Sequence, residues 1–151
     1  MDAATGIALG KVGAALVLAL AAIGSALGIG AAGQAAVGAW KKCFAQNRPA
    51  PFLQLAVCVG APITQTFYGM IVMSSKLLKL AENPQNWIAV IGWGLFGGIA
   101  IGLSAWIQGK IGAAAADAFG ETGQGFTNYL MALGIIESVA IFVMVFILVF
   151  A

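Results

Sequence analysis

Long apolar segments, separated by short polar connections, set the pattern of this chain. The apolar segments run from about Gly6 to Trp40, Pro51 to Leu80, Trp87 to Phe119 and Phe126 to Ala151. Each is long enough for a membrane-spanning helix, which needs about 20 mostly apolar residues. The sequence contains no run in which apolar and polar residues alternate with the period of a strand. The pattern therefore predicts an all-α integral membrane protein with four transmembrane helices.

The connections hold residues that end helices. The first, Lys41 to Pro49, closes on a proline, the second centres on Glu82-Asn83-Pro84, and the third is the glycine-rich stretch Gly120 to Gly125. A helix over residues 87–119 would be about 50 Å long at 1.5 Å per residue. The hydrocarbon core of a bilayer is about 30 Å thick. We therefore expect the first and third helices to project beyond the membrane on one side.

The two halves of the sequence are similar to each other. Ile29-Gly30-Ala31-Ala32 recurs as Ile111-Gly112-Ala113-Ala114, and in both halves a small-residue segment precedes a bulkier one. This repeat predicts two helical hairpins, residues 1–80 and 81–151, that arose as a duplicated unit. Within the second helix of each hairpin, we expect Gln65 to take the place in the first that Glu137 holds in the second.

Composition narrows the function classes. The chain is 62% hydrophobic and only 8% charged, with a net charge of +2 and no histidine. Soluble domains carry about 25% charged residues, so a soluble fold is excluded. Seven basic residues without a basic cluster make nucleic-acid binding improbable on charge grounds. The 21 glycines suit close helix packing in lipid, and Cys43 and Cys58 are expected to be free thiols.

The distribution of basic residues gives the orientation. Lys41, Lys42, Arg48 and Lys110 lie near the connections after the first and third helices, against Lys11, Lys76 and Lys79 on the other side. Cytoplasmic loops carry the excess of lysine and arginine. We expect a multi-pass protein of the cell (inner) membrane with both termini outside the cytoplasm.

Glu137 is the main candidate for chemistry. It stands in an apolar helix with 14 residues after it, which corresponds to about 21 Å of helix and a position deep in the membrane. Burying a carboxylate there costs about 2.5–3.5 kcal/mol on insertion scales, and intramembrane carboxylates are functional by default. We therefore expect a site for an ion or a proton in transit. The alternative is a neutral acid that only joins helices by hydrogen bonds.

Polar residues on two other segments could share the site with Glu137. Thr64 and Gln65 follow Pro62, which has no N–H and so loosens the helix, and Gln108 lies in the third segment. A carbonyl, a hydroxyl, two amide oxygens and a carboxylate form an oxygen-rich site for a hard cation. Lys110 is expected to extend toward the end of its helix, although pairing with Glu137 is an alternative that would abolish the ion site.

Together these residues resemble the duplicated proteolipid, or K/c subunit, of V/A-type rotary ATPases, and most of all the bacterial sodium-translocating members. The resemblance covers nearly the whole chain and rests on Gly24 to Gly30, Pro62 to Gly69, Gln108-Gly109-Lys110 and Glu137. It implies that Glu137 binds the ion together with Thr64, Gln65, Gln108 and the Ala61 carbonyl, while Tyr68 orients the carboxylate. Ile63 and Thr66 depart from the pattern, where smaller residues are expected.

The resemblance implies a homo-oligomeric ring in the lipid membrane that has no catalytic activity of its own. ATP would be hydrolysed in other subunits, a stator subunit bearing an arginine would displace the ion, and the loops after the first and third helices would contact a central stalk. The oxygen ligands favour Na⁺ as the cargo over H⁺. With Gln65 in place of a second carboxylate, we expect a pump rather than a synthase. A self-contained four-helix transporter with one intramembrane glutamate is the alternative from a different class.

Overall fold

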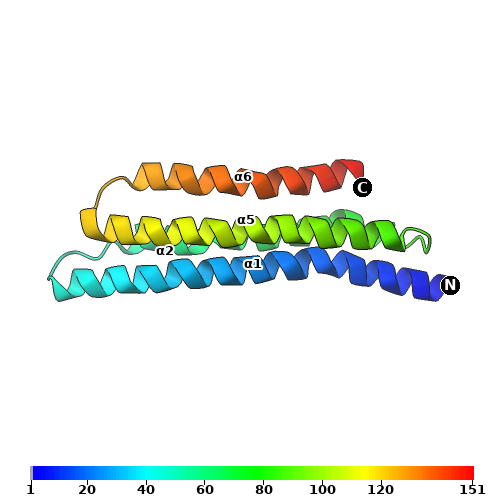
Figure 1. The fold of residues 1–151 in the computed structure, drawn as a ribbon, viewed down its shortest axis with the longest axis horizontal. Coiled ribbons are helices and arrows are strands. Elements are labelled where there is room, and N and C mark those ends of the chain that lie inside the picture. Colours follow the sequence, from blue (N-terminus) through cyan, green and yellow to red (C-terminus); the bar gives the residue numbers. More distant parts are fainter. Residues whose placement is uncertain (1) are drawn as a thin grey trace.

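The computed structural model describes residues 2–151, and over that range it consists of helices and connections without a strand (Figure 1). Helix α1 covers Ala3–Ala45, a second span covers Phe52–Leu80, α5 covers Trp87–Thr122 and α6 covers Phe126–Phe150. All four spans are long and apolar enough to cross a membrane. The predicted all-α class with four transmembrane helices is confirmed.

The C-terminal ends of α1 and α5 lie further along the chain than the sequence predicted. Helix α1 continues to Ala45, beyond the expected end at Trp40, and α5 continues to Thr122, beyond Phe119. Lysines are good helix formers, and a cation in the last turn, here Lys42, interacts favourably with the helix dipole. Helix α5 ends where Gly123 adopts a left-handed conformation, with φ of 65°.

The other end of α1 begins directly after Asp2. The Asp2 carboxylate accepts a hydrogen bond from the backbone N–H of Thr5, at 3.3 Å, and so caps the helix. The same hydrogen bond holds the pKa of the Asp2 carboxyl below its usual value. This cap explains why the helix starts at Ala3, ahead of the predicted start at Gly6.

The second span is not one regular helix. It is built from α2 (Phe52–Gly60), the 3₁₀ turn η1 (Ala61–Ile63), α3 (Thr64–Val72), the π-helical turn η2 (Met73–Leu77) and α4 (Leu78–Leu80). The 3₁₀ turn contains Pro62, whose missing N–H removes one bond from the helical ladder. In the π-helical region Ser74 donates its hydroxyl hydrogen to the Met70 carbonyl at 2.8 Å.

Helices α1 and α5 pack against each other through glycine. A Cβ on Gly24 would collide with the backbone of Gly102, and one on Gly109 would collide with the backbone of Gly28. Backbones can come this close only where side chains are absent. The close packing suggested by the glycine content is therefore present within a single chain.

The remaining spans flank this pair. Figure 1 shows α5 between α1 and α6, the second span behind them, and both termini at the same end of the bundle. At the opposite end, the Arg48 guanidinium donates to the carbonyls of Gly120 and Glu121 at 3.2 Å each, and Lys42 pairs with Glu121. These contacts fasten the first loop to the end of α5. Cys43 and Cys58 are buried free thiols, as expected.

Candidate functional site

Glu137 lies where three spans meet in the middle of the bundle. Tyr68, from α3, donates its hydroxyl hydrogen to Glu137 Oε1 at 2.6 Å. Gln108, from α5, places its Nε2 3.4 Å from Glu137 Oε2 and donates to the Leu133 carbonyl, one turn earlier in α6, at 2.9 Å. Each carboxylate oxygen thus faces a donor from a different helix.

A second set of polar groups continues from Gln108 into the second span. Gln65 donates from Nε2 to Gln108 Oε1 at 2.8 Å. The Thr64 hydroxyl lies 3.0 Å from the Ala61 carbonyl and 3.1 Å from Gln65 Oε1, and with one hydrogen it donates to one of them at a time. The Ala61 carbonyl also accepts the Thr64 N–H within the 3₁₀ turn. The structure therefore joins all six side chains and carbonyls that the sequence singled out in one hydrogen-bonded cluster.

The side chains of the cluster are buried to different degrees. Gln65 and Gln108 are completely buried, whereas Tyr68 and Glu137 are partly exposed. A buried amide without partners would cost about 1–3 kcal/mol, so the hydrogen bond between the two glutamines also stabilises the fold. The carboxylate thus lies at the edge of the cluster, where an ion could reach it.

Glu137 has no cationic partner within residues 2–151, where the only ion pair joins Lys42 and Glu121. Lys110 extends away from it and places its Nζ 4.0 Å from the centre of the Trp106 ring. The alternative in which Lys110 pairs with Glu137 is therefore wrong. Gln108 and Lys110 are two positions apart in α5, so their side chains leave the helix on different faces.

The chemistry available in this cluster is that of oxygen atoms around a single formal charge. Over residues 2–151 no three His, Cys, Asp or Glu side chains come close enough to hold a metal ion. One carboxylate can balance one monovalent cation, and neutral carbonyl, amide and hydroxyl oxygens can replace its water. The same carboxylate could instead carry a proton.

Ser104 lies next to the cluster, and reading the sequence did not single it out. It is buried and donates its hydroxyl hydrogen to the carbonyl of Ile136, the residue before Glu137, at 2.8 Å. Ser104 and Gln108 are four residues apart and so lie on the same face of α5. This spacing is visible in the sequence, but a serine in a glycine-rich helix gives too weak a signal by itself.

The two departures from the proteolipid pattern leave the cluster open. Ile63 is 46% exposed, so its side chain lies on the outer surface of the span and does not narrow the site. Thr66 donates its hydroxyl hydrogen to the Ser25 hydroxyl in α1 at 2.8 Å. That bond joins the second span to α1 and uses no group of the cluster.

One known family matches the second hairpin of the chain. Residues 91–150 match the family model for the C subunit of ATP synthase. The matched stretch contains nearly all of α5 and α6, including Gln108 and Glu137. The match covers the second hairpin and none of the first. No curated protein matches the chain at a significant level.

Proposed function

We propose that this chain is the ion-carrying subunit of the rotor ring of a V/A-type ATPase, and that each copy binds one Na⁺ at Glu137. The observation that carries the proposal is the position of Glu137: one chain supplies the carboxylate, its Tyr68 donor and its Gln108 donor from three spans. The family match of the second hairpin supports the rotor role. The duplicated hairpin supports the V/A type.

The choice of Na⁺ rests on the number of oxygen atoms in the cluster. A proton carrier needs only a carboxylate, and every further buried polar group has to be paired at a cost. Here Thr64, Gln65 and Gln108 carry a hydroxyl and two amide oxygens in the same hydrogen-bonded cluster as the carboxylate. These oxygens would replace the water that Na⁺ sheds on entering the membrane. H⁺ transport is the second candidate, in which the amides serve as bonds between helices.

Carbodiimide labelling distinguishes the two ions. The reagent reacts with the protonated acid, and bound Na⁺ displaces that proton. We expect millimolar NaCl to slow the labelling of Glu137, with protection that increases as the pH rises and that an equal concentration of choline chloride does not give. Labelling at the same rate with and without Na⁺ over the whole pH range would contradict Na⁺ binding and favour protons.

The size of the detergent-extracted assembly tests the rotor role separately. A ring of copies would migrate far above the mass of one chain, whereas a self-contained four-helix transporter would be a monomer or a small oligomer. An assembly of one or two copies with intact Glu137 labelling would contradict the rotor role and leave the ion site standing.

The partners and the orientation follow from the rotor proposal. The loops at residues 46–51 and 123–125 would contact the central stalk on the cytoplasmic side, and both termini would lie outside the cytoplasm of the cell membrane. A stator arginine would displace the ion from Glu137 as the ring turns. Single cysteines placed at Gln46 and at Gln85 should react with a membrane-impermeant maleimide from opposite sides of the membrane.

The number of ions moved per ATP would decide whether the complex runs as a pump or as a synthase. Gln65 occupies the position in the first hairpin that corresponds to Glu137, so four helices carry one charge. A ring with fewer sites moves fewer ions per turn, and each ATP can then support a steeper gradient. We expect a pump, and a measured ratio that fits two sites per chain would contradict this proposal.

A further inference from the structure

Helix α6 is attached to the rest of the chain along a narrow line. Its buried residues are Leu133, Ala140 and Ile147, which follow one another at intervals of seven. Seven residues are nearly two helical turns, so the three side chains lie on one stripe. Of the four spans, α6 is the least buried within the chain. A stripe this narrow resists separation of the helices but leaves α6 free to roll about its own axis.

Such a roll would move Glu137, which is only partly buried and stands beside the stripe. With its side chains an α-helix has a radius of about 5–6 Å, so a roll of about 20° moves a side-chain tip by about 2 Å. The Tyr68 hydroxyl lies 2.6 Å from Glu137 Oε1 and would lose its bond over that displacement. The carboxylate can therefore keep its donors only if the roll of α6 is fixed.

Two polar side chains of α5 hold the backbone of α6 next to Glu137. Ser104 donates its hydroxyl hydrogen to the Ile136 carbonyl at 2.8 Å, and Gln108 donates from Nε2 to the Leu133 carbonyl at 2.9 Å. The Ile136 carbonyl belongs to the same peptide group as the N–H of Glu137. In an α-helix that N–H bonds to the carbonyl four residues earlier, which is the one that Gln108 contacts. One such bond would act as a pivot, whereas two bonds fix the roll.

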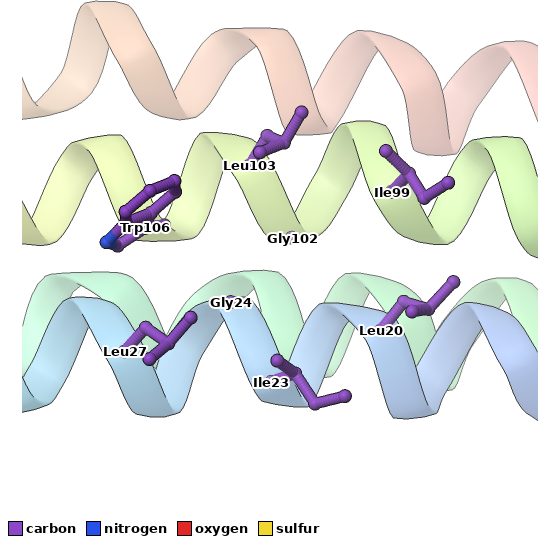
Figure 2. A pocket seen from close by; sticks show the side chains of 8 residues that line it. All are labelled: Leu20, Ile23, Gly24, Leu27, Ile99, Gly102, Leu103 and Trp106. Carbon is purple, nitrogen blue, oxygen red and sulfur yellow. The ribbon is translucent and has the colours of Figure 1, made fainter.

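The face of α5 that meets α6 differs from its neighbouring face. Figure 2 shows an apolar groove between α1 and α5, which α5 lines with Ile99, Leu103 and Trp106. Toward α6 the same helix presents Ser104 and Gln108. Ser104 is only 3% exposed, and within residues 2–151 its hydroxyl hydrogen has no acceptor other than the Ile136 carbonyl. Because burying an unpaired hydroxyl is costly, this contact accounts for a polar residue at position 104.

We propose that Ser104 is a positioning residue for Glu137. By holding the Ile136 carbonyl it fixes the roll of α6, and so it keeps the carboxylate turned toward Tyr68 and Gln108. Ser104 acts through the backbone of α6 and not on the ion. The inference rests on the proposed function in one respect, that Glu137 is the carboxylate that carries the ion, and it holds for Na⁺ and for H⁺ alike.

Carbodiimide labelling of the complete assembly tests the proposal through Ser104→Ala, which removes the hydroxyl and adds no bulk. We expect the Na⁺ concentration for half-protection of Glu137 to rise about five-fold, which corresponds to about 1 kcal/mol. In Na⁺-free buffer the labelling should become several-fold faster, because the carboxylate spends more time away from its donors. Thermal unfolding of each protein is measured in parallel.

Two matched variants separate positioning from a general loss of stability. Ile147→Val weakens the same contact between α5 and α6, where Ile147 packs against Gly97, 10 residues beyond Glu137. Its cost in stability should be comparable with the loss of one hydrogen bond. Ser74→Ala removes a serine hydroxyl that also donates to a backbone carbonyl at 2.8 Å, that of Met70 in the second span. Both variants should label and respond to Na⁺ like the unmodified protein.

The outcomes for Ser104 and for the ion are distinguishable. If Ser104→Ala labels like the unmodified protein, or if Ile147→Val changes the labelling as much at the same thermal stability, Ser104 has no positioning role and the proposal is overturned. If Na⁺ protects Glu137 in none of the proteins, the proposed Na⁺ cargo fails. The rate in Na⁺-free buffer then decides for Ser104: faster labelling in Ser104→Ala alone supports the proposal, and equal rates in all variants overturn it.

Discussion

Tyr68 and Glu137 face each other from two different helices, and the Tyr68 hydroxyl donates to Glu137 Oε1 at a distance of 2.6 Å. The two residues are 69 positions apart, one in each hairpin. The bond therefore connects the two helical hairpins at the Glu137 carboxyl group. A hydrogen bond to an ionised acceptor is worth about 1.5–3 kcal/mol, roughly twice a neutral one. Tyr68 is thus well placed to fix the direction in which the carboxylate points.

The first prediction concerns Tyr68→Phe, which removes this donor and keeps the ring. We expect the Na⁺ concentration for half-protection of Glu137 from carbodiimide to rise about tenfold, which corresponds to about 1.4 kcal/mol, while the assembly remains intact. The chain supplies a matched control in its other tyrosine, because Tyr129→Phe alters a residue near the loop, remote from Glu137. Equal Na⁺ dependence in the two variants would show that Tyr68 has no orienting role.

The second prediction concerns Glu137→Gln, which keeps the shape of the side chain and removes its charge. A neutral amide cannot balance a cation in a site of low polarity, so ion transport coupled to ATP hydrolysis should fall to background. The assembly should still form, because the amide oxygen can accept from Tyr68 and Gln108 keeps its bond to the Leu133 carbonyl. Glu82→Gln, at an exposed glutamate in the connection between the hairpins, is the control that should transport normally. Transport by the Glu137→Gln protein would show that Glu137 is not the residue that binds the ion.

The third prediction separates the two buried glutamines. Gln108 bonds to Glu137, to Leu133 and to Gln65, whereas Gln65 reaches the carboxylate only through Gln108. Gln108→Ala should therefore weaken Na⁺ protection of Glu137 more than Gln65→Ala does, and both should lower thermal stability by about 1–3 kcal/mol, since each strands a buried polar group. Gln34→Ala, at an exposed position of α1, should change neither quantity. Loss of stability without loss of Na⁺ protection would show that the two glutamines only join helices and do not bind the ion.

The apolar pattern was sufficient to predict the class of fold and the four spans. It was also sufficient to single out Thr64, Gln65, Gln108 and Glu137, because a polar side chain in an apolar helix is conspicuous. That they would meet was predicted from their positions in three apolar segments and from the resemblance to the proteolipids. Their roles in binding an ion stay predictions.

Three-dimensional packing decided the features that the sequence did not reveal. Which glycine of α1 faces which glycine of α5 depends on the register of two helices that are small-residue-rich over most of their length. The direction of Lys110 depends on Trp106, because a ring one turn away offers the ammonium a favourable surface. Helices α1 and α5 are also longer at their C-terminal ends than predicted, because the charged residues of the connections are compatible with a helix.

The last prediction tests the register of α1 on α5 through Gly109→Ala. The added methyl group would collide with the Cα and carbonyl oxygen of Gly28, and backbone atoms cannot turn aside as a flexible side chain can. Overpacking of this kind costs about 1–3 kcal/mol, which exceeds the roughly 1 kcal/mol that alanine gains over glycine in a helix. Gly38→Ala is the matched control, because a Cβ there meets no atom within 4 Å. We expect thermal unfolding in detergent to shift down for Gly109→Ala and to stay level or rise for Gly38→Ala. Because Gln108 is the neighbour of Gly109, displacing α5 should also weaken protection of Glu137 by Na⁺. A Gly109→Ala protein as stable as the control would mean that α1 and α5 pack in a different register.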